Sequence, residues 1–280
     1  MRFKKLRRLI NRLFDHSRNS ISLGEGSECR IPKGVEVKDS MIRINGKSKL
    51  VLEPGAHVFN STFQIDSDST VHIDSGTILD GVDICVWQHS ELFIGQECRM
   101  NHVRLVIDRG KVRISASNIL SSGGRSEMAT MTVADGSVSI ADHNRLQNST
   151  WVRFGGCLDI GRYNCINEGS EIRCDESVKI GSYNMISYDC DIWDTNTHCH
   201  YSLEEKKRMF ENDFPSIGLE RNKPETRPVS IGDGNWIGKR SCILKGSIIG
   251  NENVVGTRAI VSNTTVSDKQ RVLPSKSEVK

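Results

Sequence analysis

The sequence predicts an all-β solenoid, in which short strands stack coil upon coil along one axis. Seven segments share a β-branched residue or leucine, any residue, and then isoleucine or leucine before a turn, and an eighth follows after a gap: Leu50–Leu52, Val71–Ile73, Leu92–Ile94, Val112–Ile114, Val138–Ile140, Leu158–Ile160, Val178–Ile180 and Val229–Ile231. Successive steps are 21, 21, 20, 26, 20, 20 and 51 residues. A fixed period near 20 residues is typical of solenoids, whose repeats bury their apolar edges only against their neighbours.

In the last third of the chain the register tightens to six residues. The aliphatic positions are Ile160, Ile166 and Ile172, then Ile180, Ile186 and Ile192, then Ile231, Ile237, Ile243, Ile249, Val255 and Val261. Turn-forming glycine follows many of them, as in Ile160-Gly161 and Ile237-Gly238. A β-sandwich with many short strands is the alternative, but sandwich strands do not hold a six-residue register through six hexads. The pattern favours a hexapeptide β-helix with three hexads in each triangular coil.

The composition suits one elongated unit covering residues 21–266. Hydrophobic residues make up 36% of the 280 residues and aromatic residues only 6%, as expected for thin coils filled by Ile, Val and Leu. No apolar run approaches the ~18–20 residues of a membrane span, and no signal-peptide pattern is present. The nine cysteines form no C-x-x-C pair, which agrees with a reducing compartment. We expect a cytoplasmic protein.

The N-terminal segment, residues 1–20, is basic. It carries seven Lys and Arg residues against Asp15, and its apolar residues lie at helical spacing: Phe3, Leu6, Ile10, Leu13 and Phe14. This predicts a short basic amphipathic helix. Three uses remain open, namely peripheral membrane association through residues 1–16, packing with the same helix of a neighbouring subunit, or a cap over the first coil. Nucleic-acid binding is not expected, because the rest of the chain has no basic stripe with interleaved aromatics.

The solenoid is interrupted at residues 194–228, which we call the excursion. Ser202 and Glu205 form a capping box that predicts a helix running to about Asn212, and three prolines keep the returning chain extended. Removing about 31 residues restores the usual coil period. A smaller bulge around residues 121–124, structural or facing the acceptor, accounts for the step of 26, and residues 267–280 form a C-terminal tail. Long loops on a rigid scaffold often carry chemistry, so the excursion is the expected site.

Residues 158–276 resemble the left-handed β-helix acyltransferases, and most closely the galactoside/maltose-type and polysaccharide O-acetyltransferases. The likeness lies in Ile160-Gly161-Arg162 with its following coil, in the loop of His198, and in the stretch from Pro228 to Gly238. The resemblance implies a left-handed coil, homotrimers with sites between adjacent prisms, and transfer of an acetyl group from acetyl-CoA to a sugar hydroxyl.

In that family a loop histidine is the general base, and the matching residue is His198, with His200 as a rival two residues on. An imidazole with an ordinary pKa near ~6.5 can take a proton from an alcohol and return it to a departing thiolate. The resemblance makes Asn167 and Asp175 acceptor-binding residues, with His200 beside them. Asp194 or Asn196 would orient the ring of His198.

The donor side would use the last coils. The resemblance assigns CoA contacts to Trp236, Gly238, Lys239, Thr257, Arg258, Ser262 and Lys276. The amide after Gly238 would face the thioester oxyanion, and Lys276 would lie near the nucleotide phosphates. The chain departs from the family where Ser262-Asn263 replaces Thr-Lys, so one phosphate-pairing charge is missing, and Arg258 or Lys239 is expected to replace it.

The resemblance implies a cytoplasmic acetyl-CoA-dependent O-acetyltransferase that modifies a surface polysaccharide, and the basic N-terminal segment would suit work near the inner membrane face. One alternative is a non-catalytic solenoid scaffold in a polysaccharide-assembly complex, which would not bind CoA. A zinc enzyme of the γ-carbonic-anhydrase kind needs three converging histidines, and none follows residue 143 except His198 and His200. No metal is therefore expected. A right-handed β-helix lyase is disfavoured, because the N-terminal coils gather no acidic or basic cluster.

Overall fold

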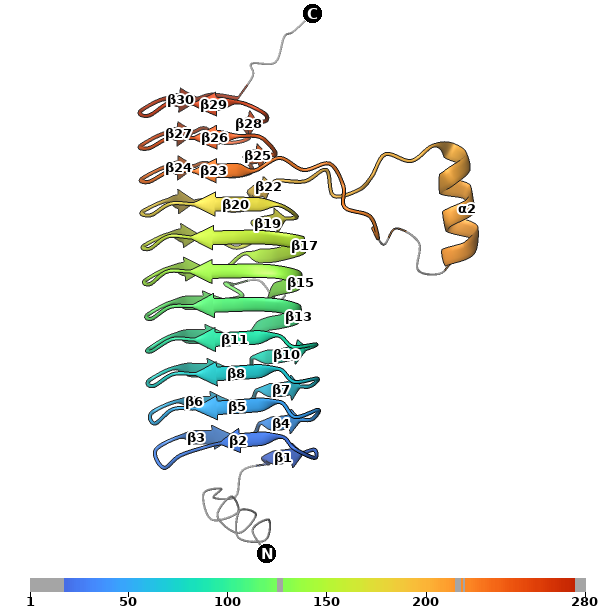
Figure 1. Cartoon of the computed structure of the whole chain (residues 1–280). Coiled ribbons are helices and arrows are strands. Elements are labelled where there is room, and N and C mark those ends of the chain that lie inside the picture. The colour runs from blue at the N-terminus through green and yellow to red at the C-terminus, as the bar shows by residue number, and fades with distance from the viewer. Residues whose placement is uncertain (1–17, 125–127, 215–217, 219, 275–280) are drawn as a thin grey trace, which may run out of the picture.

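The computed structural model describes residues 18–124, 128–214, 218 and 220–274. These residues form a column of stacked parallel strands, from which the excursion stands out to one side (Figure 1). The prediction of an all-β solenoid is confirmed. Strands run from Ser20 to Val272, a little beyond both expected bounds of the solenoid. The expected N-terminal helix, apart from its last three residues, and Lys276 lie outside the described residues.

Each coil contributes one strand to each of three faces. Face A holds β1 (Ser20–Leu23), β4 (Met41–Ile44), β7 (Thr62–Ile65), β10 (Asp83–Trp87), β19 (Glu171–Cys174), β22 (Asp191–Trp193), β25 (Cys242–Leu244) and β28 (Ile260–Val261). Face B holds β2 (Glu28–Arg30), β5 (Lys49–Leu52), β8 (Thr70–Ile73), β11 (Glu91–Ile94), β20 (Ser177–Ile180), β23 (Val229–Ile231), β26 (Ile248–Ile249) and β29 (Thr265–Val266).

Three longer strands turn the corner from face A to face B and join the two into one 19-stranded sheet: β13 (Val103–Ile114), β15 (Ala129–Ile140) and β17 (Ser149–Ile160). Face C is a separate 11-stranded sheet of β3 (Glu36–Lys38), β6 (His57–Phe59), β9 (Ile78–Asp80), β12 (Arg99–Asn101), β14 (Ile119–Ser121), β16 (Arg145–Leu146), β18 (Cys165–Ile166), β21 (Met185–Ile186), β24 (Trp236–Ile237), β27 (Val254–Val255) and β30 (Arg271–Val272). The column is thus a three-sided prism.

The core runs along the axis of the prism. All twelve aliphatic side chains of the six-residue register are at most 4% exposed, which confirms that they point inward. Glycines next to them let the coils approach closely: a Cβ on Gly181 would lie 2.7 Å from the carbonyl oxygen of Gly232 in the next coil. At the corners, Tyr183 and Gly234 adopt φ values of 61° and 66°, a conformation that favours glycine or a short polar residue.

Buried asparagines form a ladder at the corner that precedes face C. Asn144, Asn164, Asn184, Asn235 and Asn253 each stand two residues before a buried aliphatic residue. The Oδ1 atom of Asn184 accepts the backbone amide of Asn235 at 2.8 Å and its side-chain amide at 3.1 Å. In the same way, the Oδ1 atom of Asn164 accepts the backbone amide and the side-chain amide of Asn184. The ladder satisfies polar groups that the stacked coils would otherwise bury without partners.

Replacing Asn184 by alanine is expected to lower the free energy of unfolding by about 2 kcal/mol, because the buried amide of Asn235 loses its acceptor. Denaturant unfolding would measure the loss. The matched control is Met185→Ala on the neighbouring, 63% exposed side chain, which is expected to change stability by less than about 0.5 kcal/mol. Equal effects of the two substitutions would contradict the role given to the ladder.

The excursion leaves after β22 and returns at β23, while β20 and β23 pair directly in register. Its neck is closed by an antiparallel bridge between Thr195 and Thr226. The single helix of the described residues, α2 (Leu203–Asp213), starts with the predicted capping box, in which Ser202 accepts the amide of Glu205 and donates its own amide to the Glu205 side chain. Within the described residues, no helix has the length and apolar character needed to cross a membrane.

Candidate functional site

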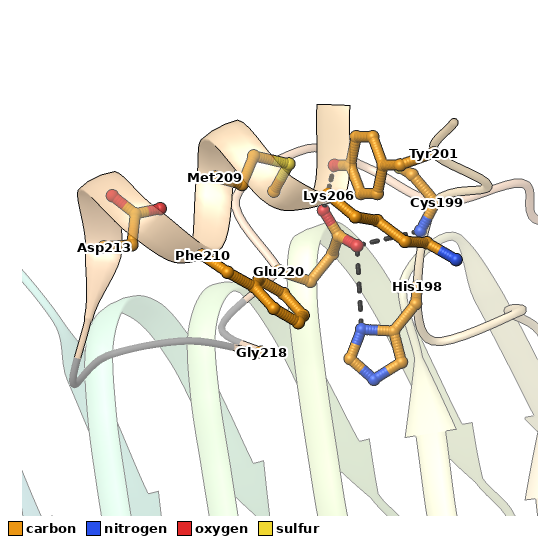
Figure 2. A pocket seen from close by; sticks show the side chains of 9 residues that line it. All are labelled: His198, Cys199, Tyr201, Lys206, Met209, Phe210, Asp213, Gly218 and Glu220. Atoms are coloured by element: carbon orange, nitrogen blue, oxygen red, sulfur yellow. Dashed lines mark hydrogen bonds and ion pairs between the residues drawn. The ribbon is translucent and has the colours of Figure 1, made fainter. Parts of the chain in front are cut away.

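His198 lies on the first arm of the excursion, between its neck and α2. Its side chain is 61% exposed, and its Nδ1 atom lies 3.6 Å from an Oε atom of Glu220 on the returning arm. Figure 2 shows the imidazole below this carboxylate, with the second ring nitrogen directed away from it. A proton held on Nδ1 toward Glu220 leaves Nε2 with a free lone pair, which is the form of imidazole that can act as a base.

The carboxylate of Glu220 is the anchor of this site. Its side chain is only 2% exposed, and it accepts the Tyr201 hydroxyl at 2.7 Å and the Cys199 amide at 2.8 Å, with a longer bond from the Asn222 amide. Burial pushes the pKa of Glu220 upward, but these donors together hold it below its ordinary value. The hydrogen bond from the Tyr201 hydroxyl to Glu220 raises the pKa of Tyr201 to about 12.

The lowered pKa of Glu220 determines how its contribution to stability depends on pH. A carboxylate whose pKa is lowered in the folded protein contributes stability above its ordinary pKa, and loses that contribution only as the pH falls through the lowered value. Glu220 therefore stays ionised and Tyr201 stays a donor throughout the neutral range. The negative charge beside His198 is permanent under those conditions.

A pocket of about 280 Å³ opens beside His198, between the first arm of the excursion and α2 (Figure 2). Its lining comes from the excursion alone: His198, Cys199, Tyr201, Lys206, Met209, Phe210, Asp213, Gly218 and Glu220. The walls are mostly apolar, with the imidazole at one side and the ammonium of Lys206 nearby. A base that borders an open pocket of this size can meet the hydroxyl of a small bound acceptor.

Among the described residues, neither of the two residues expected to orient His198 forms a hydrogen bond with its ring. Asp194 is fully buried, and its carboxylate accepts the backbone amides of Asp175, Glu176 and Ser177 at 2.7–2.8 Å. Asn196 is exposed, and its backbone amide donates to the carbonyl of Glu225 across the neck. Glu220 stands beside the imidazole instead.

Sequence reasoning missed Glu220, because it lies in an irregular segment with no period to mark it. The one available signal was its place in the same excursion as the histidine.

Among the described residues, no hydrogen bond links the expected acceptor-binding residues to His198. Asp175 is fully buried in a two-pronged ion pair with Arg153, at 3.0 and 2.8 Å, and also accepts the hydroxyl of Thr195. Asn167 donates to the carbonyl of Ile186 in the next coil. His200 is exposed. Asp175 thus supports the neck of the excursion, since Thr195 forms the bridge that closes it.

Of the expected donor-side residues that the structure describes, Gly238 is buried and the others lie on exposed positions of the last coils. Trp236 is 56% exposed on face C, in register with Met185 and Val254. Lys239 lies 3.8 Å from Asp189, and its carbonyl accepts the amide of Arg258 in the coil above. Thr257, Arg258 and Ser262 are exposed, and the amide of Gly238 bonds the carbonyl of Val255. Their role toward CoA stays a prediction.

Among the described residues, no group of three histidine, cysteine or acidic side chains is arranged to hold a metal ion.

No family model matches the sequence, and no curated protein is similar to it in sequence. Among solved structures, the chain is similar to the polySia-specific acetyltransferase NeuO, at 15% identity and a TM-score of 0.37, over 92% of this chain and 76% of that one. It is also similar to the polysialic acid O-acetyltransferase OatWY, at 16% identity and a TM-score of 0.28, over 89% of this chain and 79% of that one.

Proposed function

We propose that this protein is an O-acetyltransferase that moves an acetyl group from acetyl-CoA to a saccharide hydroxyl. The observation that carries the proposal is the pairing of His198 with the buried carboxylate of Glu220 at the edge of the pocket. A histidine oriented by a permanent negative charge, beside a space for an alcohol, has the arrangement required of a general base. The resemblance of residues 158–276 to sugar O-acetyltransferases supplies the reaction class.

In the proposed reaction, Nε2 of His198 removes the proton of the acceptor hydroxyl while its oxygen attacks the thioester carbonyl of acetyl-CoA. Glu220 stabilises the imidazolium that forms, as a buried carboxylate does for other catalytic histidines. The backbone amide of Lys239, after Gly238, is proposed to stabilise the tetrahedral oxyanion. The C–S bond then breaks, and the thiolate takes the proton from the imidazolium. The products are the acetyl ester and CoA, and no covalent enzyme intermediate forms.

The assembly is proposed to be a homotrimer, as the family resemblance implies. In the single chain, the ring of His198 is 61% exposed and every lining residue of the pocket belongs to the excursion. A neighbouring prism would cover the histidine and bring the proposed donor residues of one subunit toward the excursion of another. The pathway proposed is the decoration of a surface polysaccharide, at the cytoplasmic face of the membrane.

The test is incubation of the full chain with acetyl-CoA and candidate saccharides, following free thiol and the mass of the acetylated sugar. Release of CoA matched by an equal amount of acetyl ester is the expected result. Calorimetric titration with CoA addresses the scaffold alternative, since a scaffold has no reason to bind the coenzyme. Absence of both CoA binding and transfer across a panel of acceptors would contradict the proposal and favour the scaffold.

A further inference from the structure

We propose that Tyr201 is a positioning residue, which fixes the carboxylate of Glu220 so that the ring of His198 keeps its proton on Nδ1. This inference rests on the proposed function, because it names a further residue of the same site. Two observations lead to it: the direction of the hydrogen bonds at the Tyr201 hydroxyl, and the place of Tyr201 between the two arms of the excursion.

The two oxygens of the Glu220 carboxylate have different partners. Its Oε1 atom accepts the Tyr201 hydroxyl at 2.7 Å and the Asn222 backbone amide at 3.2 Å. Its Oε2 atom accepts the Cys199 amide at 2.8 Å and lies 3.6 Å from Nδ1 of His198. Figure 2 shows the carboxylate between the hydroxyl and the imidazole. A carboxylate that is only 2% exposed needs bonded oxygens, so the partners of Oε1 determine where Oε2 faces.

Tyr201 is the side chain that holds Oε1. Within the part of the chain that the structure describes, its hydroxyl is the one side-chain group that donates a hydrogen bond to Glu220, and the other two donors are backbone amides. A hydrogen bond to an ionised group is stronger than one between neutral groups. Loss of the hydroxyl would therefore free the carboxylate to turn away from the imidazole.

The direction of this bond is fixed by Asn222. The side-chain amide of Asn222 donates to the Tyr201 hydroxyl oxygen at 3.1 Å, so a hydroxyl proton directed toward it would meet another donor. The proton is left to point at Glu220. That bond raises the pKa of Tyr201 to about 12, which keeps the hydroxyl a donor throughout the neutral range.

Tyr201 also joins the two arms of the excursion next to α2. It directly precedes Ser202, the N-cap of α2, and its hydroxyl contacts Glu220 and Asn222 on the returning arm. Because α2 supplies Met209 and Phe210 to the pocket, the same contact sets the pocket wall against the carboxylate. A misplacement of about 1 Å at such a point can lower a rate by ~10²-fold.

The first test is Tyr201→Phe, which keeps the ring and removes only the hydroxyl. We expect kcat for acetyl transfer to fall by ~10-fold, as when one hydrogen bond to a charged group is lost, with KM for acetyl-CoA unchanged. The matched control is Tyr183→Phe, because Tyr183 is 60% exposed on the prism and lies outside the excursion. We expect the control to leave kcat unchanged. An unchanged kcat in Tyr201→Phe would contradict the role of Tyr201.

The double variant Tyr201→Phe/Glu220→Gln distinguishes positioning through Glu220 from general support of the loop. If Tyr201 acts through the carboxylate, the double variant has the same kcat as Glu220→Gln alone. If the two losses multiply instead, Tyr201 acts independently of Glu220, and the inference is overturned.

Nitrogen-15 NMR of the histidine rings separates this inference from the proposed reaction, because it needs no turnover. His198→Ala assigns the signals, and at a pH where the ring is neutral the wild type is expected to carry its proton on Nδ1. Tyr201→Phe is expected to move a share of that proton to Nε2. Asn222→Asp is expected to act in the same direction, because it keeps Tyr201 in place and gives the hydroxyl proton a competing acceptor.

A shift toward Nε2 in either variant supports the role of Tyr201 even if no acetyl transfer is detected. Asn222→Asp decides the matter where Tyr201→Phe disturbs folding, which denaturant unfolding would reveal. Spectra of both variants that match the wild type overturn the inference and leave the acetyltransferase proposal standing.

Discussion

Replacing His198 by alanine is expected to lower kcat for acetyl transfer by ~10²–10⁴-fold, with little change in KM for acetyl-CoA. The variant removes the base that takes the acceptor proton. It leaves Glu220 bonded to Tyr201 and to the Cys199 amide, so the pocket keeps its shape. The ring is 61% exposed, and its loss should not affect folding.

Steady-state kinetics at saturating acetyl-CoA measures the effect, and His200→Ala provides the control two residues away. The control is expected to stay within about threefold of the wild type, because His200 is exposed and does not line the pocket. The kcat of Glu220→Gln is expected to lie between those of His198→Ala and His200→Ala. This substitution keeps the shape of the side chain and removes the charge that stabilises the imidazolium. Full activity of His198→Ala would remove His198 from the mechanism. Loss of activity in His200→Ala, together with full activity of His198→Ala, would do the same.

Replacing Arg153 by methionine is expected to destabilise the protein by about 3 kcal/mol, because it leaves the fully buried carboxylate of Asp175 without its cation. Arg153 is 22% exposed and binds both oxygens of Asp175. The same carboxylate accepts the hydroxyl of Thr195 at the neck. We therefore expect the loss to loosen the excursion before the prism unfolds, seen as faster hydrogen exchange in residues 195–213.

Denaturant unfolding measures the global effect. Arg104→Met is the matched control, because Arg104 is 51% exposed and pairs with Asp83 only at 3.5 Å, an interaction worth less than about 1 kcal/mol. Adding Asp175→Asn to Arg153→Met should recover part of the loss, since the unpaired charge is removed. If Asp175→Asn instead raised KM for the acceptor without changing stability, the original assignment of Asp175 to acceptor binding would be supported.

Much of the fold follows from the sequence alone. Ile231, Ile243 and Val255 could be placed inside the prism from their spacing, and Ser202 with Glu205 located the start of α2. The asparagine ladder was also present as a repeated Asn two residues before a buried aliphatic, but without the coil register its hydrogen bonds could not be assigned. These features are predictable because each coil contacts only its two neighbours, so a local pattern repeats as a local geometry.

The candidate site depends on contacts that no local pattern contains. His198 could be singled out as a loop histidine, but Glu220, which lies beside it, is 22 residues away on the returning arm, and the sequence offered Asp194 or Asn196 as the orienting residue. The closure of the neck decided among them. It buries Asp194 against three backbone amides and joins the backbone amide of Asn196 to the carbonyl of Glu225, and Glu220 lies beside the imidazole.

The amino-acid sequence by itself therefore determined the periodic stacking, the position of the excursion and the first turn of its helix. Which carboxylate lies beside His198, and the shape of the pocket, were decided by the tertiary structure. The physical reason is that an irregular loop has no repeated neighbour, so its contacts are set only when its two arms meet.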